Sequence, residues 1–212
     1  GSHIGMVAKY GEVVIDPYGF LCTTKYDVTY TGKPAHAGVE PNAGRNALAA
    51  ACSATLQLLG IQRHGKGMTR VNVGMLNAGK GRNVIPPNAT MVMEVRGETG
   101  EINDFMAEQA MNIIKGNAIS YGVEYSVSKM GAACDMKNDP EMIDLLRETA
   151  KTIPEIKTIT ESANFGGSED ASLLGADRKA GHHQFNFDVN EPALDTGFQM
   201  FAGMVKRILA RK

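Results

Sequence analysis

The sequence predicts a mixed α/β protein whose central part is a four-stranded antiparallel sheet covered on one face by two helices. Alternating apolar side chains, such as Val71, Val73 and Met75, predict the strands. A 3.6-residue apolar period across residues 101–121 predicts the longer helix. Since residues 21–129 follow the order β-α-β-β-α-β, we expect a ferredoxin-like sandwich that buries its own core.

The first elements along the chain are a strand at 12–15, a turn at 16–19 and a strand at 21–30. A helix is expected over 43–59, and Gly60 stands where a helix often ends in the left-handed conformation. Its predicted apolar stripe consists of Leu48, Cys52, Leu56 and Leu59.

Two further strands are predicted at 69–76 and 89–97, joined by a polar, glycine-rich loop. The helix at 101–121 ends at Gly122, and a last strand covers 123–128. Its predicted apolar period comprises Ile102, Phe105, Met106, Ala110, Ile113 and Ile114.

The chain after the strand at 123–128 is predicted to contain only a few helices and short strands. Asp139 followed by Pro140 predicts a helix start, since Asp is a good N-cap and Pro is tolerated in the first turn. An extended piece near Ile159, a glycine-rich turn into a short helix, a strand at 182–187 and a final helix at 192–210 follow. Two helices and two short strands do not make an independent α/β domain. We therefore expect that part of the domain to which they belong is absent.

Composition excludes some functional classes. Formal net charge is −1 and no basic run occurs, which disfavours nonspecific nucleic-acid binding. Cys22, Cys52 and Cys134 lie far apart without CxxC spacing, cannot all pair with one another, and indicate thiols in a reducing compartment. No segment resembles a membrane span or a signal peptide, so a cytoplasmic origin is expected.

Three polar residues are candidates for binding or catalysis. His36 lies in a loop between small residues and could approach a ligand, although from the residue alone a solvated loop histidine is the favoured explanation. Asn83 ends a glycine-rich loop, and Arg96 ends a strand on the face of Glu94. An amide beside a guanidinium suits a carboxylate. A turn-forming Asn and a surface Arg are the alternative.

The C-terminal part adds a second group of candidates. Gly167 lies in a glycine-rich turn whose backbone could contact a substrate, or which simply begins a helix with Ser168 as N-cap. His182 and His183 are adjacent on a predicted strand and face opposite ways. His183 shares a face with phenylalanines, which fits either a core histidine or a metal ligand.

Together these segments resemble the M20 family of peptidases and amidohydrolases. The resemblance rests on five segments in the family's order, Tyr30-Thr31-Gly32-Lys33-Pro34-Ala35-His36-Ala37-Gly38, Asn83-Val84-Ile85-Pro86, Met93-Glu94-Val95-Arg96, Gly167-Ser168-Glu169-Asp170 and His183-Gln184-Phe185-Asn186-Phe187-Asp188. Within the family, segments such as Arg63-His64-Gly65 resemble the p-aminobenzoyl-glutamate hydrolase subfamily.

The resemblance implies a lid and dimerisation domain at 21–131, inserted in a partial catalytic domain formed by 1–20 and 132–212. It implies that His36 reaches across a homodimer to stabilise the oxyanion, and that Asn83 and Arg96 hold the substrate's carboxylate. Gly167 would contact the substrate through its backbone. His183 would be a metal ligand, with His182 as the fallback.

His3 would be a further ligand if it is native, although Gly1-Ser2-His3 also resembles the remnant of a purification tag. The family uses two divalent metal ions, zinc or manganese, to hydrolyse amide bonds of N-acyl amino acids or small peptides. Its N-terminal metal ligands and its general-base Glu have no counterpart in this sequence. A catalytic zinc needs about three protein ligands, so we expect this chain alone to be inactive.

Two other functions are alternatives. The chain could be a non-catalytic dimerisation module, since a ferredoxin-like sheet has open edges. RNA binding through the sheet would need exposed aromatic side chains on the central strands. The strand at 69–76 has none, and the charge is not basic, so this function ranks last.

Overall fold

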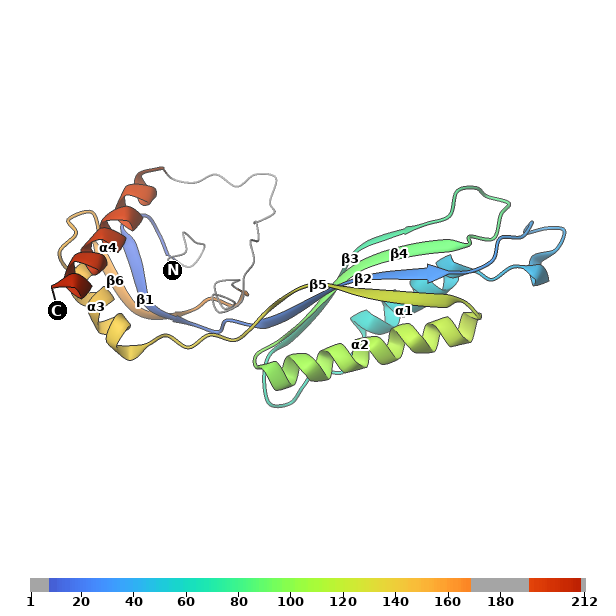
Figure 1. Ribbon diagram of the computed structural model, residues 1–212, viewed down its shortest axis with the longest axis horizontal. Coiled ribbons are helices and arrows are strands. Elements are labelled where there is room, and N and C mark those ends of the chain that lie inside the picture. The colour runs from blue at the N-terminus through green and yellow to red at the C-terminus, as the bar shows by residue number, and fades with distance from the viewer. Residues whose placement is uncertain (1–7, 169–190, 211–212) are drawn as a thin grey trace. The chain divides into compact units, whose positions relative to one another are not determined.

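The computed structural model describes residues 8–168 and 191–210, without the side chains of 191–194. The chain divides into two compact units (Figure 1). Unit 1 comprises residues 1–20, 136–167 and 171–212, and unit 2 comprises 21–135 and 168–170.

Unit 2 is a four-stranded antiparallel sheet with two helices. Its elements are β2 (Cys22–Thr31), the 3-10 turn η1 (Pro41–Ala43), α1 (Ala47–Leu59), β3 (Thr69–Ala78), β4 (Asn88–Gly97), α2 (Gly100–Tyr121) and β5 (Glu124–Ala133). The strands lie in the order β3-β4-β2-β5, so β3 and β5 are the edges. The predicted order of strands and helices is confirmed, and β5 is five residues longer at its C-terminal end than predicted.

The core of unit 2 lies between the sheet and the helices. Alternate residues of β4 point into it, and Met91, Met93 and Val95 are buried while Val92 is exposed. The deeply buried Tyr30 donates a hydrogen bond from its hydroxyl to the carbonyl of Ile114 at 3.0 Å. This bond satisfies the one polar atom that the aromatic side chain brings into the core.

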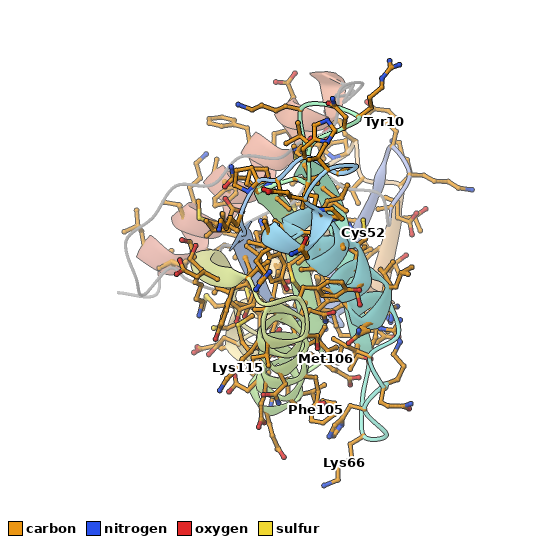
Figure 2. All side chains as sticks on the ribbon, turned by 90° about the vertical axis from the view of Figure 1, so that its right-hand side faces the viewer. Tyr10, Cys52, Lys66, Phe105, Met106 and Lys115 are labelled. Atoms are coloured by element: carbon orange, nitrogen blue, oxygen red, sulfur yellow. The ribbon has the colours of Figure 1, made fainter. Side chains whose placement is uncertain are left out.

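Helix α2 follows its predicted period. Met106 is fully buried on the face that packs against the sheet, while Phe105 is partly buried and meets His64 edge-on, with ring centroids 5.2 Å apart (Figure 2). The Thr99 hydroxyl accepts from the Ile102 amide at the helix start, and Gly122 ends the helix in the left-handed region at φ 61°.

The predicted stripe of α1 is wrong. The helix buries Ala47, Ala50, Ala51, Ala54 and Leu58. Leu56 and Leu59 are 74% and 47% exposed, and Cys52 is exposed as well (Figure 2). Because α1 carries apolar residues all round, its sequence does not decide which face is buried. Alanine allows α1 to approach α2 and the sheet closely, so its small face is turned inward.

The described part of unit 1 contains two strands and two helices. Strands β1 (Glu12–Tyr18) and β6 (Thr158–Asn164) pair in parallel, with α3 (Pro140–Ala150) and α4 (Glu191–Leu209) completing the described part. The predicted turn at Asp16-Pro17-Tyr18-Gly19 is wrong in its first three residues, because β1 runs through them, and only Gly19 has a left-handed backbone, at φ 76°. The predicted start of α3 is confirmed, as Asp139 accepts from the Met142 amide at 3.0 Å.

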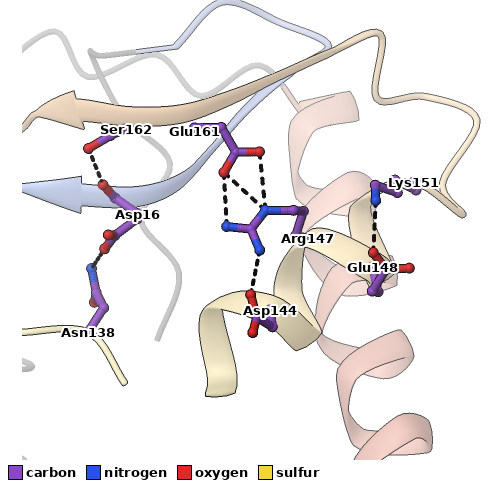
Figure 3. Close-up of polar contacts among 8 residues, drawn as sticks. All are labelled: Asp16, Asn138, Asp144, Arg147, Glu148, Lys151, Glu161 and Ser162. Carbon is purple, nitrogen blue, oxygen red and sulfur yellow. Dashed lines mark hydrogen bonds and ion pairs between the residues drawn. The ribbon is translucent and has the colours of Figure 1, made fainter. Parts of the chain in front are cut away.

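The core of unit 1 consists of Ile15, Ala150, Ile153 and Met200, with partly buried neighbours around them. Around it, Arg147 of α3 contacts Glu161 of β6, with Nε 3.0 Å from Oε2, and Asp144 at 2.5 Å (Figure 3). These ion pairs lie at the surface, where each contributes little to stability.

Several predicted features fall outside the described residues, namely the short helix after Ser168 and the strand at 182–187. Within the described part, no helix combines the length and the apolar character that crossing a membrane requires.

Candidate functional site

Two loops of unit 2 meet at one end of its sheet. The loop after β2 carries His36, and the loop between β3 and β4 carries Asn83. The Ala37 amide donates to the Asn83 carbonyl at 2.9 Å, and the Ile85 amide donates to the Ala35 carbonyl at 2.9 Å. His36 and Val84 therefore form a short antiparallel bridge, so the structure brings His36 and Asn83 of the same chain together.

The His36 loop is closed at its base. Lys33 and Arg45 exchange two backbone hydrogen bonds of 3.0 and 2.9 Å. A Cβ atom at Gly32 would lie 2.1 Å from the Arg45 carbonyl oxygen, so only glycine permits this approach. The loop presents His36 from a fixed base.

The ring of His36 has a defined orientation. Its Nδ1 accepts hydrogen bonds from the backbone amides of Gly38 at 3.2 Å and Val39 at 3.1 Å. An acceptor nitrogen carries no proton, so the neutral ring has its proton on Nε2. The side chain is exposed. His36 can therefore donate a hydrogen bond from Nε2 to a group outside its own loop.

Arg96 lies on the face of the sheet opposite the helices, near the C-terminal end of β4. Its Nε donates to Glu94 Oε1 at 2.8 Å, and its Nη2 lies 2.7 Å from the same oxygen. Both side chains are about three-quarters buried, with 28% and 25% exposed. Nη1 takes part in neither contact. Glu94 thus orients the guanidinium and offsets its charge.

Arg96 is distant from Asn83 within one chain. β4 runs as an extended strand from Asn88 to Gly97, and an extended strand rises about 3.3 Å per residue. The eight steps from Asn88 to Arg96 therefore span about 26 Å. A single amino-acid-sized ligand cannot touch both Asn83 and Arg96 of the same chain.

The remaining candidates lie elsewhere. Gly167 lies two residues after Phe165, whose ring stacks on Phe20 with ring centroids 4.9 Å apart. Ser168 shares a hydroxyl hydrogen bond with Thr23, the residue opposite Arg96 on β2. His3, His182 and His183 lie outside the described residues.

Among residues 8–168 and 191–210, no group of three or more His, Cys, Asp or Glu side chains could hold a metal ion. The two histidines that the resemblance assigns as ligands fall short of the three or so that catalytic zinc needs. The candidate residues of this chain therefore do not by themselves form a complete metal site.

Sequence reasoning missed the role of Glu94. The alternation of β4 already puts Glu94 on the face of Arg96, two residues apart, which is the available signal for an ion pair along the strand. It also missed the contact of Cys22 with Asp135, where the thiol donates to the carboxylate at 3.3 Å and accepts from the Asp135 amide at 3.0 Å. The spacing of 113 residues gives no local signal.

Comparison with known families identifies residues 23–122 as matching the M20 peptidase dimerisation domain. These residues cover nearly all of unit 2.

Several relatives match most of this chain, among them the following two. A homolog of p-aminobenzoyl-glutamate hydrolase from Haemophilus influenzae is 47% identical, over 99% of this chain and 53% of its own length. The indole-3-acetyl-aspartic acid hydrolase of Enterobacter agglomerans is 41% identical, over 91% of this chain and 48% of its own length. The chain thus spans about half the length of these relatives.

A solved structure is also similar to this chain in fold and sequence. The aminobenzoyl-glutamate utilization protein from Klebsiella pneumoniae has a TM-score of 0.75 and 43% identity, covering 81% of this chain and 44% of its own. An aminopeptidase PepT from Bacillus cereus, at 20% identity and a TM-score of 0.61, shows a similar fold only.

Proposed function

Because the chain belongs to the M20 family and carries its peptidase dimerisation domain, we propose that it is the C-terminal part of a metal-dependent amidohydrolase. In this proposal residues 21–131 are a ferredoxin-like lid and dimerisation domain. Residues 1–20 and 132–212 are part of a zinc-peptidase-like catalytic domain.

The proposed substrate is an N-acyl derivative of an acidic amino acid. Two relatives are named for p-aminobenzoyl-glutamate and indole-3-acetyl-aspartate, and both names describe an aromatic acyl group on an acidic amino acid. Arg96, a fork of donors on the open face of the sheet, suits a carboxylate of such a ligand. We take p-aminobenzoyl-glutamate as the first substrate to test.

The observation that carries the proposal is the distance of about 26 Å between the His36–Asn83 end of β4 and Arg96. These residues act on one substrate only if they come from different protomers. We propose that the active site combines Arg96 of one protomer with His36 and Asn83 of the other. Asn83 and Arg96 then reach the substrate's carboxylate from opposite sides.

His36 has the hydrogen-bonding state that this role needs. Because Nδ1 accepts from two backbone amides, the proton on Nε2 is the one that His36 can donate to a bound substrate. A donor placed where an amide carbonyl becomes an oxyanion stabilises the transition state. Gly167 contributes a backbone contact to the substrate.

The metal would supply the activated water, and its full ligand set requires residues beyond those of this chain. His183, with His182 as the fallback, and His3 are proposed as ligands, and the metal is zinc or manganese. Without a general base and enough ligands, this chain alone does not hydrolyse amides.

The dimer contact is proposed to involve α1 and the neighbouring edge strand β3 of a second copy. Leu56 and Leu59 form an exposed apolar patch on α1, and β3 is an edge of the sheet. An apolar patch beside an unpaired strand fits a self-complementary contact between two identical protomers.

Mixed dimers of the full-length enzyme test the shared site. His36→Ala and Arg96→Ala are each expected to lose nearly all hydrolysis of p-aminobenzoyl-glutamate. Unfolding the two variants together and refolding them should restore about one quarter of wild-type activity, because half of the dimers are mixed and one of their two sites is intact.

The matched control mixes His36→Ala with Asn83→Ala. Both residues come from the same protomer in the proposal, so this mixture should recover nothing. Recovery in the control, or no recovery in the first mixture, would refute the arrangement.

A non-catalytic dimerisation module is the second candidate, and the separate core of unit 2 favours it. Metal analysis of the full-length protein distinguishes the two. Near-stoichiometric zinc or manganese supports an assembled site, and its absence supports the module.

A further inference from the structure

Two cysteines far apart in the sequence come to the same end of unit 2. Cys22 begins β2, and the last pair of the β2–β5 ladder joins Thr23 to Ala133. In an antiparallel ladder the next residues out are therefore Cys22 and Cys134. Unit 2 begins at residue 21 and its main segment ends at 135, so both thiols lie where the chain enters and leaves it.

Opposite positions on neighbouring strands hold their Cβ atoms about 4.5–5.5 Å apart. A disulfide needs about 3.8 Å, so closure requires an approach of about 1 Å. The regular pairing ends at Ala133, and Cys134 follows the last strand residue. Cys22 is held by its pairing with Gly97 of β4, so Cys134, which lies beyond the last ladder residue of β5, makes this small movement.

The surroundings hold the Cys22 sulfur near Cys134. The Asp135 amide donates to Cys22 Sγ at 3.0 Å, and Sγ donates to Asp135 Oδ1 at 3.3 Å. The sulfur is thus bonded to the residue that directly follows Cys134.

The two thiols differ in access. Cys22 is 3% exposed, whereas Cys134 is exposed. Burial, and secondly the hydrogen bond to Asp135, raise the pKa of Cys22 to about 11, and the nearby Cys134 thiol adds to this shift. Since the thiolate is the nucleophile, Cys134 reacts first with a reagent from solution and Cys22 reacts second.

We propose that Cys22 and Cys134 form a redox modification site, a dithiol that closes to an intramolecular disulfide by exchange with a low-molecular-weight disulfide. The Cys134 thiolate attacks one sulfur of the reagent, forming a mixed disulfide and releasing one thiolate. Cys22 then gives its proton to Asp135, attacks the Cys134 sulfur and releases the second thiolate. Two protein thiols are oxidised, and one reagent disulfide is reduced to two thiols.

The consequence is a covalent link between the entry and exit strands of unit 2. The bond would close a loop containing the whole sheet and both helices, which restricts the unfolded chain most strongly when the loop is long. The oxidised form should therefore resist unfolding of unit 2 more than the reduced form does.

Oxidation of the whole chain with glutathione disulfide tests the proposal, and it needs no hydrolase activity. After blocking and digestion, mass spectrometry should find a peptide pair joined through Cys22 and Cys134. Thiols titrated in denaturant should fall from three to one, and dithiothreitol should restore all three. Cys52→Ser should keep the cross-link, whereas Cys134→Ser should abolish it.

Cys134 is exposed, so Cys134→Ser is expected to keep its fold, which circular dichroism checks. The proposal is overturned if wild-type protein with a native spectrum keeps three thiols across a glutathione titration. It is also overturned if cross-links form only through Cys52, or if Cys134→Ser oxidises as readily as wild type.

Discussion

Unit 2 and unit 1 reach their stability in different ways. Unit 2 covers one face of a four-stranded sheet with two helices over a core that includes Tyr30, Met91 and Met106. Unit 1 pairs two parallel strands and buries a much smaller core around Ile15 and Met200.

The surface of α4 extends this contrast. Large apolar side chains remain exposed along it, with Phe198 at 74% and Leu209 at 62%. Parallel strands are ordinarily buried on both faces, and a two-stranded sheet is marginal alone. The difference teaches that unit 2 buries a full core within its own residues, whereas the described part of unit 1 leaves much of the apolar surface of α4 uncovered.

The largest expected effect is therefore in a fragment of residues 21–135. It should unfold cooperatively on heating and keep the far-ultraviolet circular dichroism of an α/β protein, because its core lies within these residues. Linear loss of signal without a transition would show that unit 2 depends on unit 1, and the comparison would fail.

Matched core substitutions in the whole chain come next. Met106→Ala in unit 2 should lower the free energy of unfolding by about 3 kcal/mol, because Met106 is fully buried and its neighbours cannot collapse into the space. Met200→Ala in unit 1 should cost about 2 kcal/mol or less. Urea denaturation of both variants measures this, and equal losses would argue against the difference in packing.

A smaller effect is expected from the charged contacts of unit 1. Arg147→Ala removes the ion pairs with both Glu161 and Asp144. It should lower the urea midpoint for unfolding of unit 1 by less than half as much as Met200→Ala does. Lys151→Ala, which removes one pair with Glu148, is the control and should change it less. A larger effect of Lys151→Ala would contradict the expectation that the two contacts of Arg147 together stabilise unit 1 more than the single pair of Lys151 does.

The smallest effects should appear as opposite pH responses. Hydrogen bonds from Thr160 and Lys9 lower the pKa of Glu12, and Lys151 lowers the pKa of Glu148. Because the folded state lowers the pKa of these carboxyls, it gains stability that is present at pH values above the unfolded pKa of 4.5. This stabilisation is lost as the pH falls below 4.5. Unit 1 should therefore weaken slightly on acidification.

Unit 2 should respond at high pH. Burial raises the pKa of Tyr30, and burial with the Asp135 hydrogen bond raises the pKa of Cys22 from 9.0 to about 11. Because the folded state raises the pKa of this thiol, it gains stability that is fully present below pH 9. This stabilisation is lost as the pH rises toward 11. Thermal midpoints between about pH 3 and 11 measure both responses, and Cys22→Ala should flatten the alkaline limb.

Much of the fold followed from local patterns. The period of Met106, Ala110 and Ile114 predicted the buried face of α2. The alternation predicted for β3 held at Val71 and Val73 but failed at Met75, which is exposed beyond a register shift after Val73. Asp139 marked a helix start and Gly122 a helix end, because their backbone and side-chain chemistry acts within a few residues. Such features depend on neighbours along the chain, which the sequence contains.

The face that α1 buries depended on tertiary packing. Leu48, Cys52, Leu56 and Leu59 satisfied the helical period as well as the alanines did, so the sequence alone favoured the larger side chains. The distance available between α1, α2 and the sheet selected the alanine face instead.

For the candidate site, the sequence by itself determined which residues have suitable chemistry, namely His36, Asn83, Arg96 and Gly167. Only the tertiary structure decided that His36 and Asn83 share one end of the sheet, that Glu94 holds Arg96 near the other end, and that Cys22 meets Asp135. The physical reason is that hydrogen bonds between distant segments depend on strand order and register, which the whole fold fixes at once and no local pattern encodes.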